Sequence, residues 1–328
     1  MITALACAVC AVGVMPAADN LVSADVTYEN EELKYGDYLE YQKIESDYSE
    51  SGIMISGCDK SATSVEIPAE IDNLPVKWIG GSAFSDCVLL EDIIIPDSVT
   101  SIEYDAFSRC ISLKAINIPD SVTKIRNEAF SGCKNLSSIE IPDSVTEIGY
   151  RTFYGCEKLS AINVSSGNNN YSSIDGVLFN KDKTELEQYP AEKSETMYII
   201  PNSVTKIDEN AFCGCTSLEE ITIPDSVTEI GKSAFYGTQL IETQDGVEYV
   251  GKWVVGSDKD ITSAEIKDGT KGIACSAFLS RNNLATISIP DSVTNIGENA
   301  FSETQLIENQ DGIEYVGKWV VGYNADIT

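Results

Sequence analysis

The sequence contains no histidine, and this absence excludes more classes of function than any other feature of its composition. Without imidazole there are no Ser-His-Asp or Cys-His nucleophile pairs, no histidine-containing zinc sites and no imidazole general bases. Basic residues are scarce as well, because 22 lysines and arginines stand against 52 aspartates and glutamates, for a net charge of −30. That balance argues against nucleic acid as a partner and against an anionic membrane surface, since both attract lysine and arginine.

Cysteine and the usual catalytic motifs are also sparse. Ten cysteines in 328 residues are too few for a disulfide-scaffold miniprotein. The chain has no P-loop, no Gly-x-Gly-x-x-Gly and no Gly-x-Ser-x-Gly sequence. Apolar residues nevertheless make up 43%, which is enough for a core. We therefore expect an acidic, core-forming protein that is not an enzyme and uses no cofactor.

The first residues have the character of an export signal. Residues 2–15 are apolar and rich in alanine and valine, too short to span a bilayer but suited to the core of a signal peptide. Val22 and Ala24 place small residues before a cut after Ala24, although a basic segment at the start is missing. The pattern predicts a signal peptide over 1–24, a secreted or cell-surface location, and no integral membrane span in the mature chain.

Internal repeats dominate the remainder of the chain. Pro-Asp-Ser-Val-Thr begins at Pro96, Pro119, Pro142, Pro224 and Pro290, and the first three copies are 23 residues apart. A phenylalanine recurs in phase with them, at Phe84, Phe107, Phe130, Phe153, Phe212, Phe235, Phe278 and Phe301. A cysteine three residues further on marks five of these units: Cys87, Cys110, Cys133, Cys156 and Cys215.

Each unit has a pattern that predicts its local structure. Ile116 and Ile118 alternate with Asn117, which predicts a strand with one buried face. Pro-Asp-Ser ends that strand in a turn, and Val-Thr-x-Ile predicts a second short strand. We expect Ala-Phe-x-x-Cys to be a single helical turn that points Phe and Cys inward. Since 23 residues cannot bury these side chains alone, the units must stack into a solenoid, a rod roughly 40–60 Å long at about 4.8 Å per strand.

The repeat resembles the BspA-like class of bacterial leucine-rich repeats. The stretch from Leu136 to Cys156 follows the consensus Leu-x-x-Ile-x-Ile-Pro-x-Ser-Val-Thr-x-Ile-Gly-x-x-Ala-Phe-x-x-Cys, except that Thr152 replaces alanine. The resemblance extends over about residues 62–328. It implies a leucine-rich-repeat solenoid, mostly β, with short parallel strands. It also implies an exported or surface protein, as members of that class are. Some of those members mediate adhesion to host proteins or to other cells.

Segments outside the period predict a cap and inserted hairpins. Residues 25–61 lack the repeat and are expected to cap the first unit. Insertions at about 165–195 and 239–262 each predict a β-hairpin, the first with a five-residue loop and the second with a type II′ turn at Gly251-Lys252. The second insertion recurs at 305–328, where the sequence stops inside a unit, so we expect the natural protein to extend beyond Thr328.

The aromatic residues of the repeated hairpin are the candidate binding residues: Tyr249, Trp253, Tyr315 and Trp319. Exposed tyrosine and tryptophan on a rigid hairpin are typical contact anchors and also suit sugar stacking. The competing interpretation is that these side chains attach each hairpin to the solenoid. Substituting both tryptophans by alanine separates the two, because one interpretation predicts lost binding and the other lost stability.

Two further ladders have competing interpretations. The five in-phase cysteines suit small buried hydrophobes better than a redox or metal site, and we expect mainly free, inert thiols. Cys58, Cys213 and Cys275 lie off the ladder and could pair, but no pairing can be deduced. The turn aspartates could bind Ca²⁺ as a stack, yet a turn residue accepting local hydrogen bonds is favoured, and we predict no metal site. They are Asp97, Asp120, Asp143, Asp225 and Asp291.

These features together predict a non-catalytic, exported binding or adhesion module. Its partner is expected to be a protein or glycan, recognised through the repeat surface and the inserted hairpins. The first alternative is a spacer or targeting segment of a larger extracellular enzyme or cell-surface protein. The second is a glycoside hydrolase that uses paired carboxylates, which is disfavoured because no constellation stands out from the regular repeat.

Overall fold

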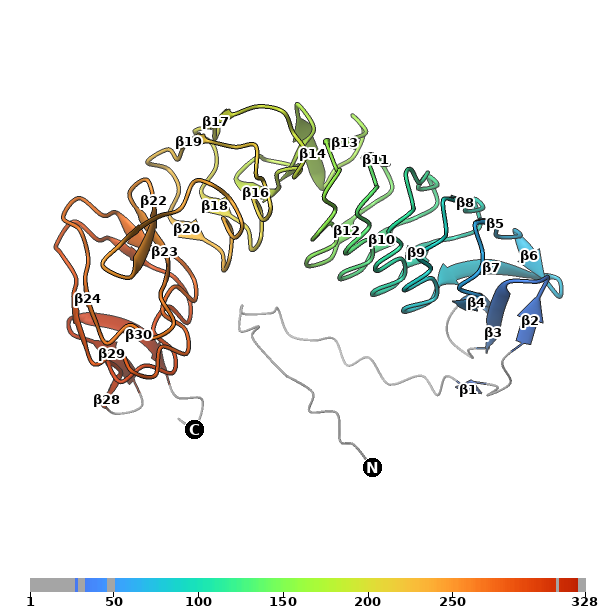
Figure 1. The fold of residues 1–328 in the computed structure, drawn as a ribbon. Coiled ribbons are helices and arrows are strands. Elements are labelled where there is room, and N and C mark those ends of the chain that lie inside the picture. Colours follow the sequence, from blue (N-terminus) through green and yellow to red (C-terminus); the bar gives the residue numbers. More distant parts are fainter. Residues whose placement is uncertain (1–26, 29–32, 46–50, 311–312, 324–328) are drawn as a thin grey trace.

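The computed structural model describes residues 27–28, 33–45, 51–310 and 313–323, so the predicted signal peptide over 1–24 lies outside the described residues. The described residues form short strands and turns without any α-helix. Successive turns stack on one another, and the stack follows a curved path that forms an arch (Figure 1). The predicted solenoid fold is therefore confirmed.

One set of parallel strands follows the Val-Thr-x-Ile segments along the inner side of the arch (Figure 1). The first stretch of this inner sheet contains β4 (Gly52–Cys58), β7 (Leu74–Ile79), β9 (Ser101–Ile102), β10 (Lys124–Ile125) and β12 (Glu147–Ile148). The second stretch contains β16 (Glu185–Gln188), β18 (Lys206–Ile207) and β20 (Glu229–Ile230). The third contains β23 (Trp253–Ser257), β25 (Gly272–Ile273) and β27 (Asn295–Ile296), and β30 (Trp319–Tyr323) follows.

A second set of parallel strands lies on the outer side of the arch, before the proline turns or the segments that replace them. These strands pair two by two: β5 (Ser64–Glu66) with β8 (Asp92–Ile94), β11 (Ser138–Ile141) with β13 (Ala161–Val164), β17 (Met197–Ile199) with β19 (Glu220–Thr222), and β24 (Ser263–Glu265) with β26 (Thr286–Ser288). The strand predicted at Ile116 and Ile118 is not formed, although both side chains are buried. In that unit the alternation of apolar and polar residues therefore indicates which side chains are buried, but the backbone does not form a hydrogen-bonded strand.

The prediction of a helical turn around each phenylalanine was wrong. Residues two before and two after Phe107, namely Asp105 and Arg109, have φ of 55° and 59°, in the left-handed region. Their N–H groups donate to the carbonyls of Asn127 and Ser131 in the next turn, at 3.0 and 2.7 Å. A helix would use these groups within its own segment. The alternating left-handed residues instead let the segment bond to its neighbour.

The two in-phase ladders fill the interior. All eight phenylalanines are at most 4% exposed, and neighbouring rings stack with centroids 5.1–6.1 Å apart within each uninterrupted run. The five ladder cysteines are at most 1% exposed. The ring spacing exceeds the roughly 4.8 Å between paired strands. The expected rod is curved, because the stacked turns form an arch (Figure 1).

The N-terminal segment adds antiparallel strands to the end of the inner sheet. β3 (Leu39–Glu45) pairs with β4, and both β1 (Thr27–Tyr28) and β2 (Leu33–Tyr35) pair with β3. A further short strand, β6 (Glu70–Ile71), pairs with β7. Leu39 and Tyr41 lie in the first core cluster, so this segment covers the apolar edge of the first turn.

The first insertion forms three antiparallel strands and joins two core clusters. β14 (Tyr171–Ile174) pairs with β15 (Val177–Asn180), which pairs with β16. Leu178 packs into the cluster before the insertion, whereas Val177 and Phe179 pack into the cluster after it. The hairpin is therefore a partition whose two faces both lie in the core.

The second insertion repeats this arrangement. β21 (Glu242–Gln244), β22 (Val247–Val250) and β23 are antiparallel, and Gly251 with φ of +57° begins the two-residue turn. Val250 and Trp253 belong to the preceding cluster, while Tyr249 and Val254 belong to the following one. Both apolar faces of this hairpin are thus accounted for. The third copy comprises β28 (Glu308–Gln310), β29 (Ile313–Val316) and β30.

Candidate functional site

The inner sheet is interrupted where the first insertion enters, between β12 and β16. The N–H of Ile148, on the free edge of β12, donates to the phenol oxygen of Tyr171 at 2.8 Å in place of a strand partner. Asn168 fixes the same region from inside: it is fully buried, and its amide nitrogen donates to the carbonyls of Pro142 and Val145. We call this region between β12 and β16 the joint. It departs from the repeat pattern, so it is the first candidate for a functional site.

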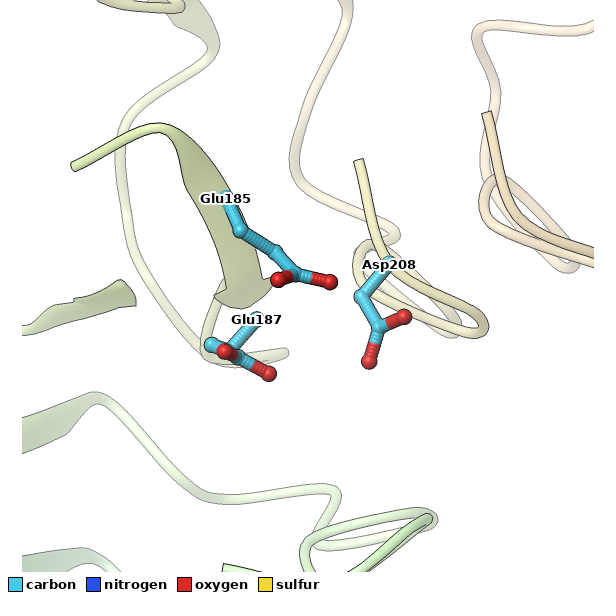
Figure 2. A group of neighbouring side chains, drawn as sticks. All are labelled: Glu185, Glu187 and Asp208. Atoms are coloured by element: carbon cyan, nitrogen blue, oxygen red, sulfur yellow. The ribbon is translucent and has the colours of Figure 1, made fainter. Parts of the chain in front are cut away.

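Three carboxylates gather at this joint. Glu185 and Glu187 project from β16, and Asp208 follows β18 in the next turn (Figure 2). One oxygen of each lies within 4.8 Å of the others. Lys206 forms ion pairs with Glu185 and, at 3.3 Å, with Asp208. The pairing of β16 with β18 creates the cluster, because Glu185 lies opposite Lys206 and Leu186 opposite Ile207, so that Glu187 and Asp208 follow at the same level. Glu187 also shares a strand face with Glu185.

The environment favours the protonated form of Glu187. Burial is the largest cause, and the neighbouring Glu185 and Asp208 charges add to it, raising the pKa of Glu187 to about 8. Lys206 opposes this shift. The pKa of Lys206 is itself raised, because its bonds to Glu185 and Asp208 outweigh the cost of its burial. Near neutral pH Glu187 is therefore poised between charge states, and a cationic group placed beside it would ionise it.

A small cavity opens beside Glu187. It measures about 180 Å³ and is lined in part by Glu187, Asp208, Glu209 and Tyr150. The Tyr150 hydroxyl donates to Glu209 at 2.7 Å and so bridges the two sides of the joint. Burial first, and then this carboxylate, raise the pKa of Tyr150 to about 12.

A separate open groove of about 790 Å³ shares Tyr150, Asp208 and Glu209 with this cavity. The groove collects residues that lie in or directly follow the inner strands of several turns. Its charged residues are Asp208, Glu209, Glu229, Glu298 and Glu303, against Lys206 and Lys232. The groove is thus acidic along its length and is suited to basic side chains.

The same geometry weighs against catalysis and against a resident metal ion. A protonated carboxyl beside ionised carboxylates is the arrangement that glycosidases use. Lys206, however, already pairs with two of the three carboxylates, Glu185 and Asp208. Ca²⁺ takes six to eight oxygen ligands, whereas Lys206 already holds Glu185 and Asp208 in ion pairs.

The structure places the predicted aromatic anchors in different environments. Tyr249 and Trp253 are both 2% exposed, so they lie in the core and are not presented to a partner. The ring of Trp253 covers Gly272 so closely that a Cβ there would lie 2.3 Å from it. Tyr315 and Trp319 are half-buried. The interpretation of these residues as surface contacts therefore does not fit the first pair, and for the second pair it stays a prediction.

The ladder cysteines sit in apolar surroundings with local partners. The thiols of Cys110, Cys133 and Cys156 each donate to a phenylalanine carbonyl of the preceding turn, at 3.1–3.2 Å. Burial raises the pKa of Cys156 to about 12 and raises that of Cys110, Cys133 and Cys215 as well. These thiols are therefore poor nucleophiles. Cys213 and Cys275 are half-buried and, like the other described cysteines, free.

The turn aspartates are exposed and form no metal cluster among the described residues. The acidic groups whose ligand atoms converge in that part of the chain are those of the joint instead. Ordering of the proline turns comes from the residue after each aspartate. The hydroxyls of Ser121, Ser144 and Ser226 donate to carbonyls of the preceding turn, at 2.5–2.7 Å. The expected aspartate ladder is thus a solvated edge.

No helix in the described part of the chain has the length and apolar character needed to cross a membrane. A family model described as BspA type leucine rich repeat region matches residues 77–196 and 189–308. No curated protein matches the sequence.

Several solved structures are similar to this chain. A leucine rich cell surface protein from Faecalibacterium prausnitzii is 26% identical over 81% of this chain and 91% of its own, with a TM-score of 0.44. The pneumococcal vaccine antigen PcpA is 18% identical over 82% and 90%, with a TM-score of 0.45. A leucine rich repeat protein of T. pallidum is 25% identical over 57% and 81%, with a TM-score of 0.36.

Proposed function

Because the chain belongs to the BspA-type leucine-rich repeat family, we propose that it is an exported, non-catalytic binding module that recognises a basic segment of a protein partner through the acidic groove. The observation that carries the proposal is the acidic lining of the groove, which shares Tyr150, Asp208 and Glu209 with the cavity at Glu187. Together they place five carboxylates against two lysines along the inner side of the arch, with Glu187 beside them. Lysine or arginine side chains would complete this charge distribution.

The extended shape of the site favours a chain segment over a compact small molecule. The groove gathers side chains from turns as far apart as Asn127 and Glu303, which a segment can contact in succession. The predicted platforms Tyr249 and Trp253 are buried, and the groove is lined mainly by charged and small polar side chains, which favours a basic peptide over a glycan. Export rests on the signal peptide predicted at 1–24, and a mature chain beginning at Asp25 in the extracellular fraction would support it.

Binding of a fluorescent lysine–glycine repeat peptide to the full chain tests the groove. The groove variant carries Glu187→Gln, Asp208→Asn and Glu209→Gln. The matched control removes three exposed charges from the outer strands β5, β19 and β24, through Glu66→Gln, Glu220→Gln and Glu265→Gln. We expect the groove variant to bind about tenfold more weakly, or about 1.4 kcal/mol, because charged contacts in a partly buried site are lost.

The control variant should differ from the unmodified chain by less than about twofold, since exposed charges contribute little individually. Equal weakening in both variants would show attraction to net charge alone and would contradict a groove. Saturable binding to a neutral glycan array, unaffected by the groove variant, would replace the protein partner with a glycan. Absence of saturable binding to both the peptide and the glycan array would favour the alternative that the chain is a spacer.

A further inference from the structure

The cysteine ladder has an irregular first member. Cys110 donates its thiol hydrogen to the carbonyl of Phe84, in the preceding turn. Cys87 is one turn earlier, and below it lies the cap segment at the end of β4 in place of another phenylalanine turn. Its surroundings therefore differ from those of every other ladder cysteine.

Cys58, the last residue of β4, fills this place. The Cys58 thiol lies within hydrogen-bonding reach of the Cys87 sulfur and also lies 3.5 Å from the Asp59 carbonyl oxygen, and both cysteines are free thiols. The Lys60 ammonium lies 3.8 Å from the Cys87 sulfur and also donates to the Ser85 carbonyl. Cys58 is 7% exposed and Cys87 is fully buried, while Lys60 is exposed. The thiol pair thus lies just beneath the surface, under a single lysine side chain.

We propose that Cys58 and Cys87 are a disulfide-forming pair that fastens the N-terminal cap to the first repeat turn. Ladder cysteines cannot pair with one another easily, because parallel neighbouring strands hold their Cβ atoms about 4.8 Å apart and parallel. Cys58 is free of this restriction, since it belongs to the cap and approaches Cys87 from a different element. Lys60 supplies the positive charge that favours a thiolate at Cys87.

The chemistry is thiol–disulfide exchange with a small-molecule disulfide such as oxidised glutathione. The Cys87 thiolate attacks one sulfur of the reagent, forms a mixed disulfide and releases one small thiol. Cys58 loses its proton to solvent and attacks the Cys87 sulfur, and the second small thiol leaves. Two protein thiols are oxidised to one disulfide, and one reagent disulfide is reduced to two thiols. Direct hydrogen bonding from Cys58, assisted by Lys60, lowers the pKa of Cys87 and so favours the first attack.

The bond would connect residues 29 positions apart and restrict opening of the cap. Closing a loop of this length lowers the population of the opened state by roughly 400-fold in the chain-entropy account. The oxidised cap should accordingly resist proteolysis far better than the reduced cap. This role is independent of the acidic groove, which lies in later turns.

Peptide mapping of the full chain tests the proposal. The protein is refolded from urea in a reduced and oxidised glutathione buffer, alkylated, and digested without reductant for mass spectrometry. We expect one linked peptide pair that contains Cys58 and Cys87 and disappears on reduction. Cys58→Ser and Cys87→Ser should each abolish it, whereas the matched ladder variant Cys110→Ser should retain it.

The unmodified chain alone decides the question if a serine variant fails to fold. Complete alkylation of both Cys58 and Cys87 after this treatment would overturn the proposal, and so would a predominant link from either residue to another cysteine. Limited proteolysis of the oxidised and the reduced chain then measures how far the disulfide protects the cap from cleavage. Equal cleavage rates within residues 33–58 would overturn the stabilising role even if the bond forms.

Discussion

The second and third hairpin copies have almost the same sequence but meet different neighbours. Their register is the same, since Tyr249 pairs with Val254 as Tyr315 pairs with Val320, and both have the same bulge. Their burial is not the same. Val254 is fully buried by the turns that follow it, whereas Val320 is 63% exposed. The local sequence therefore determines the hairpin, and the stacking of further turns determines whether its outer face becomes core.

The same comparison explains the placement of the tryptophans. Trp253 is 2% exposed and packs over Gly272 of the next inner strand, with which it is paired. Trp319 is half-buried, and its indole nitrogen is buried without a hydrogen-bond partner. The two tryptophans occupy equivalent positions of the hairpin, but Trp253 belongs to the core whereas Trp319 is only half-buried, so they should contribute differently to stability.

Removing each tryptophan should give the largest contrast between the copies. We expect Trp253→Ala to lower the free energy of unfolding by about 3–5 kcal/mol, because a large buried side chain is lost and a cavity is left. Trp319→Ala should lower it by about 1–2 kcal/mol, since less apolar area is buried there. Urea unfolding followed by far-UV circular dichroism measures both. Equal losses would show that the neighbouring turns do not decide burial.

A smaller and equal effect is expected at the turn glycines. Gly251 and Gly317 both have φ of +57°, and a Cβ added at either would meet no atom within 4 Å. Gly→Ala at each position should therefore cost the same, about 1–2 kcal/mol, through backbone conformation alone. The measurement is the same urea titration. A difference of more than about 1 kcal/mol between the two variants would show that the stacked turns also constrain the hairpin turn.

The positions of the buried residues within each repeat could be predicted from the sequence, because equivalent residues of successive turns pack against one another. Each in-phase phenylalanine meets another phenylalanine one period away, so a pattern that holds in one unit must hold in its neighbour. The hairpin register at Gly251-Lys252 was equally accessible, since a two-residue turn fixes its flanking pairs. The stacking of the phenylalanines and the hairpin register were predicted correctly, whereas the strand at Ile116 and Ile118 and the helical turn at each phenylalanine were not.

Features that arise between turns were not predicted. The left-handed residues beside Phe107 are aspartate and arginine, which carry no glycine signal, and their conformation is set by bonds to the next turn. Burial of Asn168 and of Glu187 depends on how two stacks meet at an insertion. The 23-residue period does not predict the carboxylate cluster at the joint, because the insertion shifts the pairing of β16 with β18 to an offset of 21 residues, with Glu185 opposite Lys206.

The two joints extend the comparison to pH. The second joint is filled by Tyr249 and Trp253, whereas the first contains Glu187 with its pKa raised to about 8. Between the ordinary carboxyl pKa and about 8, the folded chain holds a proton at Glu187 that the unfolded chain has released. The resulting stability is fully present at low pH and is lost as the pH rises through 8.

We expect Glu187→Gln to reduce the loss of unfolding free energy between pH 5 and pH 8 by roughly 3 kcal/mol, because glutamine stays neutral throughout that range. Urea midpoints at pH 5, 6.5 and 8 provide the measurement. The exposed Glu220→Gln is the matched control and should follow the unmodified chain, since both changes remove one acid. Repulsion within this acidic chain also grows with pH, so only the difference between these two variants isolates the joint. Parallel curves for Glu187→Gln and Glu220→Gln would mean that Glu187 is ionised in the folded chain like any surface carboxylate, and that the two joints respond to pH alike.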